Sequence, residues 1–309
     1  MVFSVYLIIN IFSLDLHLKT KERKDMEMRF WLVTTDHLED RLWFRDAEDF
    51  KAAMNIIAIL SITTPVKILA FILMSNHVHF VLGCSREEAL VFINSFKKHY
   101  SQYYQHKYNQ KEALRNNGVD IREVQIGDES FERAVAYVQM NSVAANISLS
   151  AFDYPWGTGN TFFRSMPPEG SKVETFSGRA LARIIRSKVQ LPGSYLIDRG
   201  GFVNPYSYVG ISLVESVFRS PKRMNYFLQN SSKAKKVSEA PSFSDQLVSE
   251  GLKNLCVSLF RKQTIMDLDT TQASEVLKQL RFRFSSDPNQ LARISGLSYE
   301  KVCNMLEMI

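Results

Sequence analysis

The chain has 309 residues, of which 45% are hydrophobic and 23% charged, a composition ordinary for a soluble globular protein. Its length is too great for one small core, so we expect two or three compact units. Lysine and arginine total 38 against 32 aspartate and glutamate residues. The excess of positive charge favours an acidic partner, of which nucleic acid is the usual one, although many enzymes are mildly basic.

The chain has three cysteines, which are Cys84, Cys256 and Cys303. Their wide spacing and odd number exclude a disulfide framework and a zinc-type cysteine cluster, and they favour a reducing, cytoplasmic location. Residues 1–13 are mostly apolar but lack a leading positive charge and are too short to span a bilayer, so we expect no membrane segment there. We interpret residues 1–27 as an N-terminal arm, with Met26 or Met28 as the true start, because strand patterning begins there.

The hydrophobic pattern predicts the elements in chain order. Aromatic and β-branched residues from Met28 to Thr35 predict a first strand, and helical spacing over residues 46–60 predicts a helix. Two apolar runs about the turn-like Ser75-Asn76 predict a hairpin over residues 67–83. The remaining elements are a helix from Arg86 to about Lys107, a short strand over Ile121–Ile126 and a helix from Glu129 to about Ala145. This order predicts an α+β fold, a ferredoxin-like βαββαβ sheet with helices on one face.

The second half of the chain is mainly helical in pattern. Residues 167–171 and 230–244 are rich in proline, glycine or serine and read as connectors. Residues 287–308 show a short helix, a turn at Ser295-Gly296-Leu297 and a second helix capped by Ser298. This spacing suits a helix-turn-helix whose second helix enters a major groove, and it suits an ordinary αα-hairpin about as well.

Two histidines stand out in the second strand of the hairpin. Side chains alternate between the faces of a strand, so His77 and His79 share one face, with Cα atoms roughly 6.5–7 Å apart. Both rings can converge on one metal ion and leave most of its coordination sphere open to a substrate oxygen. A pair of histidines with this spacing can equally be hydrogen-bonded within a polar layer, and the pattern alone leaves both readings open.

The helix predicted from Glu129 offers a nucleophile and a further ligand. Tyr137 and Asn141 are one helical turn apart and stack on one face. A tyrosine hydroxyl beside a divalent ion can attack a phosphorus centre, and an asparagine carbonyl is a hard ligand suited to Mg²⁺ or Mn²⁺. Because the chain has twelve tyrosines and most tyrosines pack in cores, Tyr137 alone is not diagnostic.

Aromatic and basic side chains interleave along the helix that follows the hairpin. The candidate DNA-binding residues are Lys97, Lys98, Tyr104, Lys107 and Lys111. Aromatic rings there could stack on single-stranded bases while lysines meet phosphates. A solvated basic face over a packed aromatic stripe explains the same pattern nearly as well.

Three motifs in order carry a resemblance to a known family. They are Met74-Ser75-Asn76-His77-Val78-His79-Phe80-Val81, Ala136-Tyr137-Val138-Gln139-Met140-Asn141 and Asp153-Tyr154-Pro155-Trp156. The first resembles the histidine-hydrophobic-histidine motif of the HUH single-tyrosine transposases, and the set is most similar to the REP-associated tyrosine transposases. The resemblance covers roughly residues 28–160. Ser75 and Ser142 depart from it, since the family often has proline at both places.

The resemblance implies a role for each matched residue. His77 and His79 would hold Mg²⁺ or Mn²⁺, with Asn141 as the expected third ligand. Tyr137 would attack a phosphodiester of hairpin-flanked single-stranded DNA, giving a 5′-phosphotyrosine link and a free 3′-hydroxyl that later reverses the step. DNA is thus the implied partner, no membrane is involved, and a homodimer stays open.

With this resemblance the chain divides into four predicted parts. They are an N-terminal arm (1–27), an HUH transposase-like catalytic domain (28–164), a basic linker or accessory region (165–244) and a helical domain with the candidate helix-turn-helix (245–309). Besides a metal-dependent tyrosine transposase, two functions stay open at this point. One is a non-catalytic, domesticated DNA-binding regulator that recognises hairpins, and the other is a nuclease that uses metal-bound water.

Overall fold

The structure is a computed structural model that describes residues 28–36, 42–110, 117–233 and 243–308. The predicted N-terminal arm therefore lies outside the described residues. The strands are β1 (Phe30–Thr35), β2 (Lys67–Met74), β3 (His77–Gly83), β4 (Val119–Val124), β5 (Ser171–Lys172) and β6 (Leu196–Ile197). The helices up to the second connector are α2 (Ala47–Thr63), α3 (Arg86–Tyr108), α4 (Ser130–Gln139), α5 (Asn141–Ala144), α6 (Gly178–Ile185), α7 (Ile211–Phe218) and α8 (Pro221–Gln229). They are followed by α9 (Asp245–Phe260), α10 (Thr270–Phe284), α11 (Pro288–Ser295) and α12 (Tyr299–Glu307).

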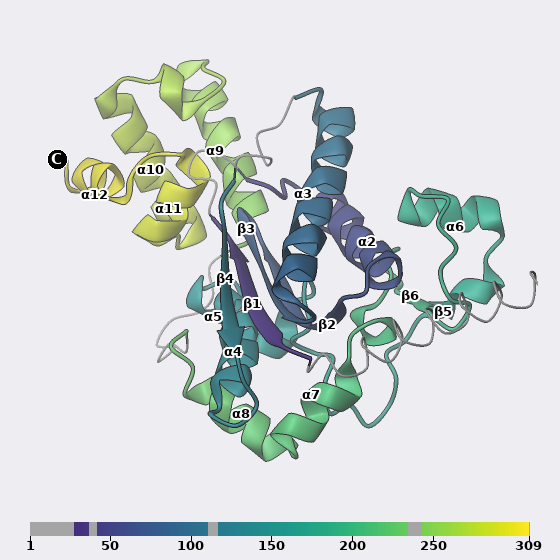
Figure 1. Cartoon of the computed structure of the whole chain (residues 1–309). Helices are drawn as coiled ribbons and strands as arrows, with labels where there is room; N and C mark the ends of the chain where they lie inside the picture. The colour runs from purple at the N-terminus through teal and green to yellow at the C-terminus, as the bar shows by residue number, and fades with distance from the viewer. Residues whose placement is uncertain (1–27, 37–41, 111–116, 234–242, 309) are drawn as a thin grey trace, which may run out of the picture.

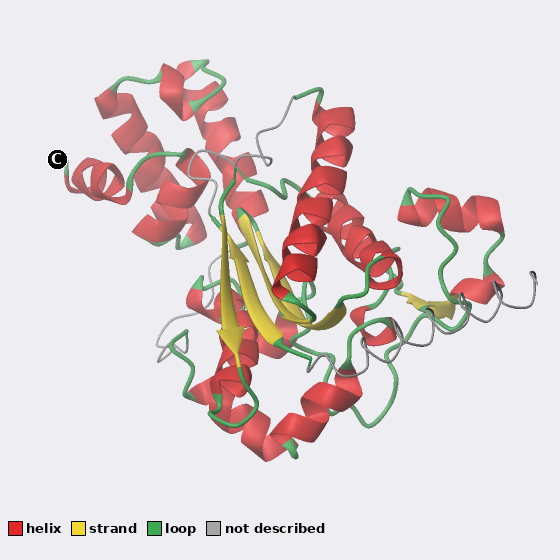
Figure 2. Cartoon of the chain, viewed as in Figure 1, coloured by secondary structure: helices red, strands yellow, loops and turns green. Residues whose placement is uncertain are grey.

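Four strands form one antiparallel sheet in the order β2-β3-β1-β4. With the chain order β1-α2-β2-β3-α3-β4, this is the ferredoxin-like arrangement that the sequence predicts. The two crossover helices, α2 and α3, lie side by side on one face of the sheet (Figure 1). On that face Phe80 contacts Phe92 and Phe96 of α3, with ring centroids 5.3 and 5.7 Å apart. The α+β prediction with a helical extension is confirmed, as the sheet between layers of helices in Figure 2 shows.

The helix that follows β4 covers the opposite face of the sheet. Phe131 of α4 packs edge-on against Phe30 of β1, with ring centroids 5.2 Å apart. Since residues alternate between faces, Phe30 and Thr34 of β1 share this face with His79, which pairs with Thr34 in the register of β1 and β3. The sheet therefore presents its histidines to α4 and its aromatic core to α3.

The helix that follows β4 is interrupted, whereas the sequence predicts one helix from Glu129 to about Ala145. Helix α4 ends at Gln139, and α5 restarts at Asn141 after Met140 adopts φ −84° and ψ 0°. The Asn141 amide nitrogen donates to the carbonyls of Tyr137 and Val138, at 2.7 and 3.3 Å. An asparagine side chain that binds carbonyls of the preceding turn competes with helical hydrogen bonding, which explains the break.

The motif Asp153-Tyr154-Pro155-Trp156 forms hydrogen bonds with the outer edge of β2. Leu73 N–H donates to the Trp156 carbonyl at 2.8 Å, and the Tyr154 hydroxyl donates to the Leu73 carbonyl at 2.8 Å. A Cβ added at Gly157 would lie 2.7 Å from the carbonyl oxygen of Phe71, so only glycine permits this approach. The segment after α5 thereby covers a strand edge that would otherwise expose unpaired backbone groups.

Helices α9 to α12 form a bundle with its own hydrophobic cluster. Its most buried members are Val248, Cys256, Val276, Leu277, Leu280, Leu291 and Val302. Helices α7 and α8 instead pack on the core of the sheet through Val214, Phe218 and Phe227. In Figure 1 the bundle stands apart from α6 to α8, at the end of the sheet where β2 turns into β3. Among the described helices, none combines the length and apolar character needed to cross a membrane.

Candidate active site

The two histidines of β3 are held side by side on the face that meets α4. Their ring centroids lie 4.8 Å apart with an interplanar angle of 87°. His77 Nδ1 lies 2.8 Å from the Asn76 amide oxygen, which can only accept, so His77 carries its proton on Nδ1. His79 Nδ1 lies 2.9 Å from the Thr34 hydroxyl. Hydrogen bonds at Nδ1 orient histidines for metal ligation through Nε2, so both rings fit a metal-binding role.

Asn141 lines the same cleft as His77 and carries an amide oxygen that could serve as a ligand. Its side-chain nitrogen is committed to the carbonyls of Tyr137 and Val138, so its amide oxygen is the group suited to a cation. Within the described residues, no group of three or more His, Cys, Asp and Glu gathers to hold a metal. The two imidazoles and the Asn141 amide oxygen could together hold a divalent ion and leave open positions on it.

Tyr137 lies on the histidine side of the sheet. Its ring meets the His79 ring edge-on, with centroids 5.4 Å apart. The Lys233 ammonium lies 5.0 Å from the centroid of the same tyrosine ring. No pattern in the sequence indicates Lys233, because it follows α8 and reaches Tyr137 only through the packing of α8 on α4. The candidate nucleophile, the histidine pair and a lysine thus lie together.

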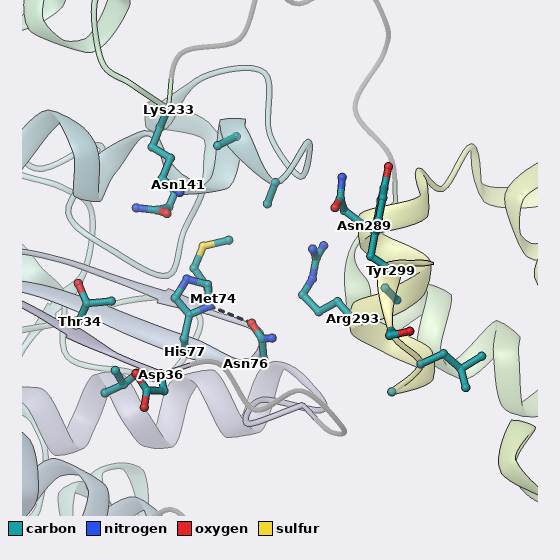
Figure 3. Close-up of a pocket in the computed structure, with 17 residues that line it drawn as sticks. Thr34, Asp36, Met74, Asn76, His77, Asn141, Lys233, Asn289, Arg293 and Tyr299 are labelled. Carbon is teal, nitrogen blue, oxygen red and sulfur yellow. Dashed lines mark hydrogen bonds between the residues drawn. The ribbon is translucent and has the colours of Figure 1, made fainter. Parts of the chain in front are cut away.

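A cleft of about 1020 Å³ opens over His77 and Asn141. Figure 3 shows Met74, Asn76, His77, Asn141 and Lys233 on one side of it and Asn289, Arg293 and Tyr299 on the other. Asp36, at the end of β1, also lines the cleft and was not singled out by the sequence. Tyr137 and His79 do not line it and lie beside it, in ring contact with one another. The cleft is thus shared between the sheet and the C-terminal bundle.

The DNA-binding residues predicted on α3 lie across the sheet from the histidines. Lys97 is 4% exposed and its ammonium donates to the backbone carbonyl of Asn117, and burial lowers its pKa. Tyr104 is 1% exposed and packs between other tyrosines of α3. A buried ring cannot stack on a base. Lys97 and Tyr104 therefore belong to the packed interior of α3 and not to a DNA-binding surface.

The remaining candidates on α3 differ in their surroundings. The Lys107 ammonium is 2.6 Å from the Asp46 carboxylate and 2.7 Å from that of Asp49, so two aspartates offset its charge. Lys98 is exposed, and Lys111 lies outside the described residues. DNA contacts on this helix stay a prediction, and among the described candidates Lys98 is the one with an exposed side chain.

Residues 19–140 match the family model described as "Transposase IS200 like". This part of the chain is therefore similar in sequence to IS200-like transposases.

Among solved structures, one described as a REP-associated tyrosine transposase bound to a REP hairpin is 16% identical, with a TM-score of 0.35. The match covers 42% of this chain and 76% of that one. No curated protein matches the chain significantly.

Proposed function

We propose that the protein is a metal-dependent tyrosine transposase that cleaves and rejoins single-stranded DNA through a 5′-phosphotyrosine intermediate. The contact between the Tyr137 and His79 rings is the observation that carries the proposal. It joins the candidate nucleophile to the histidine pair within one subunit and on one face of the sheet. A tyrosine helix on the opposite face would have left the hydroxyl and the ion without a common phosphate.

Different residues would hold the ion, attack the phosphate and bind it. His77, His79 and Asn141 would hold Mg²⁺ or Mn²⁺, which would polarise the scissile phosphate and stabilise its developing charge. Tyr137 Oη forms a bond to phosphorus while the bond from phosphorus to the 3′ oxygen breaks. The phenol proton passes to solvent, and the leaving oxygen takes up a proton to become a 3′-hydroxyl. Lys233 places positive charge beside Tyr137 and on the cleft wall, where it can hold a phosphate.

The reverse reaction explains why no nucleotide energy source is needed. The phosphotyrosine bond conserves the phosphodiester, so a 3′-hydroxyl from another strand end can attack it and release Tyr137. The resemblance of the three motifs to REP-associated transposases supports a substrate in which a hairpin flanks the single strand. A homodimer is compatible with this chemistry, although each subunit holds the candidate residues itself.

A gel assay tests the proposal directly. The protein is incubated with hairpin-flanked single-stranded DNA and Mn²⁺, and the products are separated under denaturing conditions. We expect a protein–DNA adduct from the wild type and from the control Tyr226→Phe, and none from Tyr137→Phe or His77→Ala. An adduct that survives Tyr137→Phe would contradict the proposal. Metal-dependent cleavage without an adduct would support a nuclease that uses metal-bound water.

The α11–α12 pair favours a second candidate, a non-catalytic regulator that binds hairpin or duplex DNA. Helix α11 ends at Gly296 in the left-handed region (φ 72°), and Ser298 caps α12 by accepting a hydrogen bond from Lys301 N–H. This candidate predicts binding that persists in His77→Ala and weakens steeply with salt. Metal-dependent strand cleavage by the wild type would exclude it as the whole account.

A further inference from the structure

A buried charged cluster attaches the C-terminal bundle (α9 to α12) to the β2–β3 hairpin, which carries His77 and His79. Asp245, the first residue of α9, is 1% exposed. Its carboxylate accepts hydrogen bonds from Arg293 at 2.6 and 2.8 Å, from Gln290 at 3.0 Å and from the Ser75 hydroxyl. We call Ser75, Asp245, Gln290 and Arg293 the Asp245 cluster. A buried carboxylate with a guanidinium and two further donors is a specific contact, because each group would be costly to bury alone.

The Asp245 cluster explains one departure from the family motif. The family often has proline where this chain has Ser75, and proline could not donate a side-chain hydrogen bond to Asp245. Ser75 directly precedes Asn76, whose amide oxygen accepts the Nδ1–H of His77. The bundle is therefore attached to the turn that supports the metal-binding histidine. Residue 75 departs from the motif where the C-terminal bundle, which lies outside the matched region, makes contact.

The attachment places part of the bundle across the cleft from His77. Asn289 and Tyr299 line the cleft from α11 and α12, facing Asn141 and Lys233 on the other wall (Figure 3). Tyr299 is 53% exposed although it is a large aromatic residue. Arg293 also lines the cleft, but Asp245 balances its charge, so its role is to hold the bundle in place.

The chemistry of the two walls suits one strand of nucleic acid. An exposed aromatic ring stacks on bases of any sequence, and a lysine and amide groups meet phosphates and base edges. The volume of about 1020 Å³ slightly exceeds the roughly 300–1,000 Å³ usual for small-ligand pockets, and polar and apolar side chains both line the cleft. The small residues Ala144, Ala145, Ala292 and Gly296 on its walls leave room for a chain to pass.

We propose that the C-terminal bundle is the second wall of the DNA cleft, docked through the Asp245 cluster and binding the strand beside the scissile phosphate through Asn289 and Tyr299. The proposal rests on the function proposed above for the sheet. It assigns the α11–α12 pair to single-stranded DNA at the active site, in place of an independent reader of duplex DNA.

Binding measurements on the full chain test this proposal without requiring catalysis. Affinity for fluorescein-labelled oligo-dT of increasing length is measured by anisotropy, alongside a labelled hairpin duplex. We expect Tyr299→Ala to weaken oligo-dT binding about tenfold, the order of one lost base stack. Tyr299→Phe should retain the wild-type affinity, because the ring is preserved. Tyr226→Ala, which removes a tyrosine of similar exposure (57%) from α8, should have no effect.

Two results would overturn the proposal. Tyr299→Ala could match the wild type on oligo-dT of every length, or it could weaken binding to the hairpin duplex alone, which would assign α12 to a duplex groove. If the wild type formed no covalent adduct in the gel assay, the proposed function would be refuted. Tyr299→Ala would in that case still weaken binding of the single strand. The two failures are therefore distinguishable.

Discussion

Replacing Asp245 with asparagine should separate the unfolding of the C-terminal bundle from that of the sheet. Burial opposes the ionisation of Asp245, but the Arg293 guanidinium and its hydrogen bonds hold the pKa of the carboxyl below its ordinary value. The variant leaves the Arg293 guanidinium, whose side chain is 16% exposed, without its counter-charge. Removing one partner of a buried ion pair costs about 3–5 kcal/mol of stability. We expect a cost near the lower value, because asparagine has nearly the shape of aspartate and leaves no cavity.

The tryptophans make this loss of coupling measurable. All three, Trp31, Trp43 and Trp156, belong to the core of the sheet or pack against it. Tryptophan fluorescence therefore reports the sheet, and circular dichroism at 222 nm reports helices in both parts. We expect the two signals to coincide during urea unfolding of the wild type and to separate in Asp245→Asn, with the helical signal lost first. Non-coincident transitions are the accepted sign that two parts unfold independently.

A double variant and a pH series complete the test. Asp245→Asn combined with Arg293→Met removes both charges and should cost roughly 2 kcal/mol less than the sum of the single variants. Since the pKa of Asp245 is depressed in the fold, its contribution to stability is present above the unfolded value of about 3.9 and is lost as pH falls below it. Coincident, unshifted transitions in Asp245→Asn would refute the reasoning.

Three further predictions concern other parts of the chain. Burial raises the pKa of the Cys84 thiol to about 12, so at pH 8 a thiol reagent should modify the partly exposed Cys303 and reach Cys84 only after denaturation; rapid labelling of Cys84 in the native protein would contradict this. Asn76→Ala frees the ring of His77, the candidate metal ligand, and should weaken Mn²⁺ binding, measured by calorimetry, roughly 10–100-fold; unchanged affinity would count against the ligand assignment. Gly157→Ala should lower the free energy of unfolding by about 1–3 kcal/mol, because its Cβ would meet a carbonyl oxygen of β2; the matched control Gly127→Ala, with open space around it, should change little.

The sheet and its histidines could be predicted because their signals are local. Alternation along residues 77–83 fixes His77 and His79 on one face whatever surrounds the strand. The turn at Ser75-Asn76 likewise follows from the residues themselves. One helical turn of spacing relates Tyr137 to Asn141, and across the break at Met140 the Asn141 side chain still donates to the Tyr137 carbonyl. Local periodicity therefore recovered the fold and the candidate catalytic group.

The misjudged or missed features depend on tertiary contacts. Lys97 and Tyr104 follow a pattern of aromatic and basic residues, but the packing of α3 on the sheet buries both. Lys233 reaches Tyr137 only because α8 packs on α4. The contact between Ser75 and Asp245 joins residues 170 positions apart, and no periodicity can indicate such a pair. The sequence therefore predicted the motif residues and the C-terminal helices, but it did not predict that these helices line the cleft.

We propose that Tyr137 forms the covalent bond to DNA. The most direct test is peptide mapping of the adduct formed with hairpin-flanked single-stranded DNA and Mn²⁺, with the modified residue located by mass spectrometry. We predict a nucleotide joined through its 5′-phosphate to the peptide that contains Tyr137. A modified Tyr299, which lines the cleft beside Tyr137, or the absence of any modified tyrosine would contradict the account.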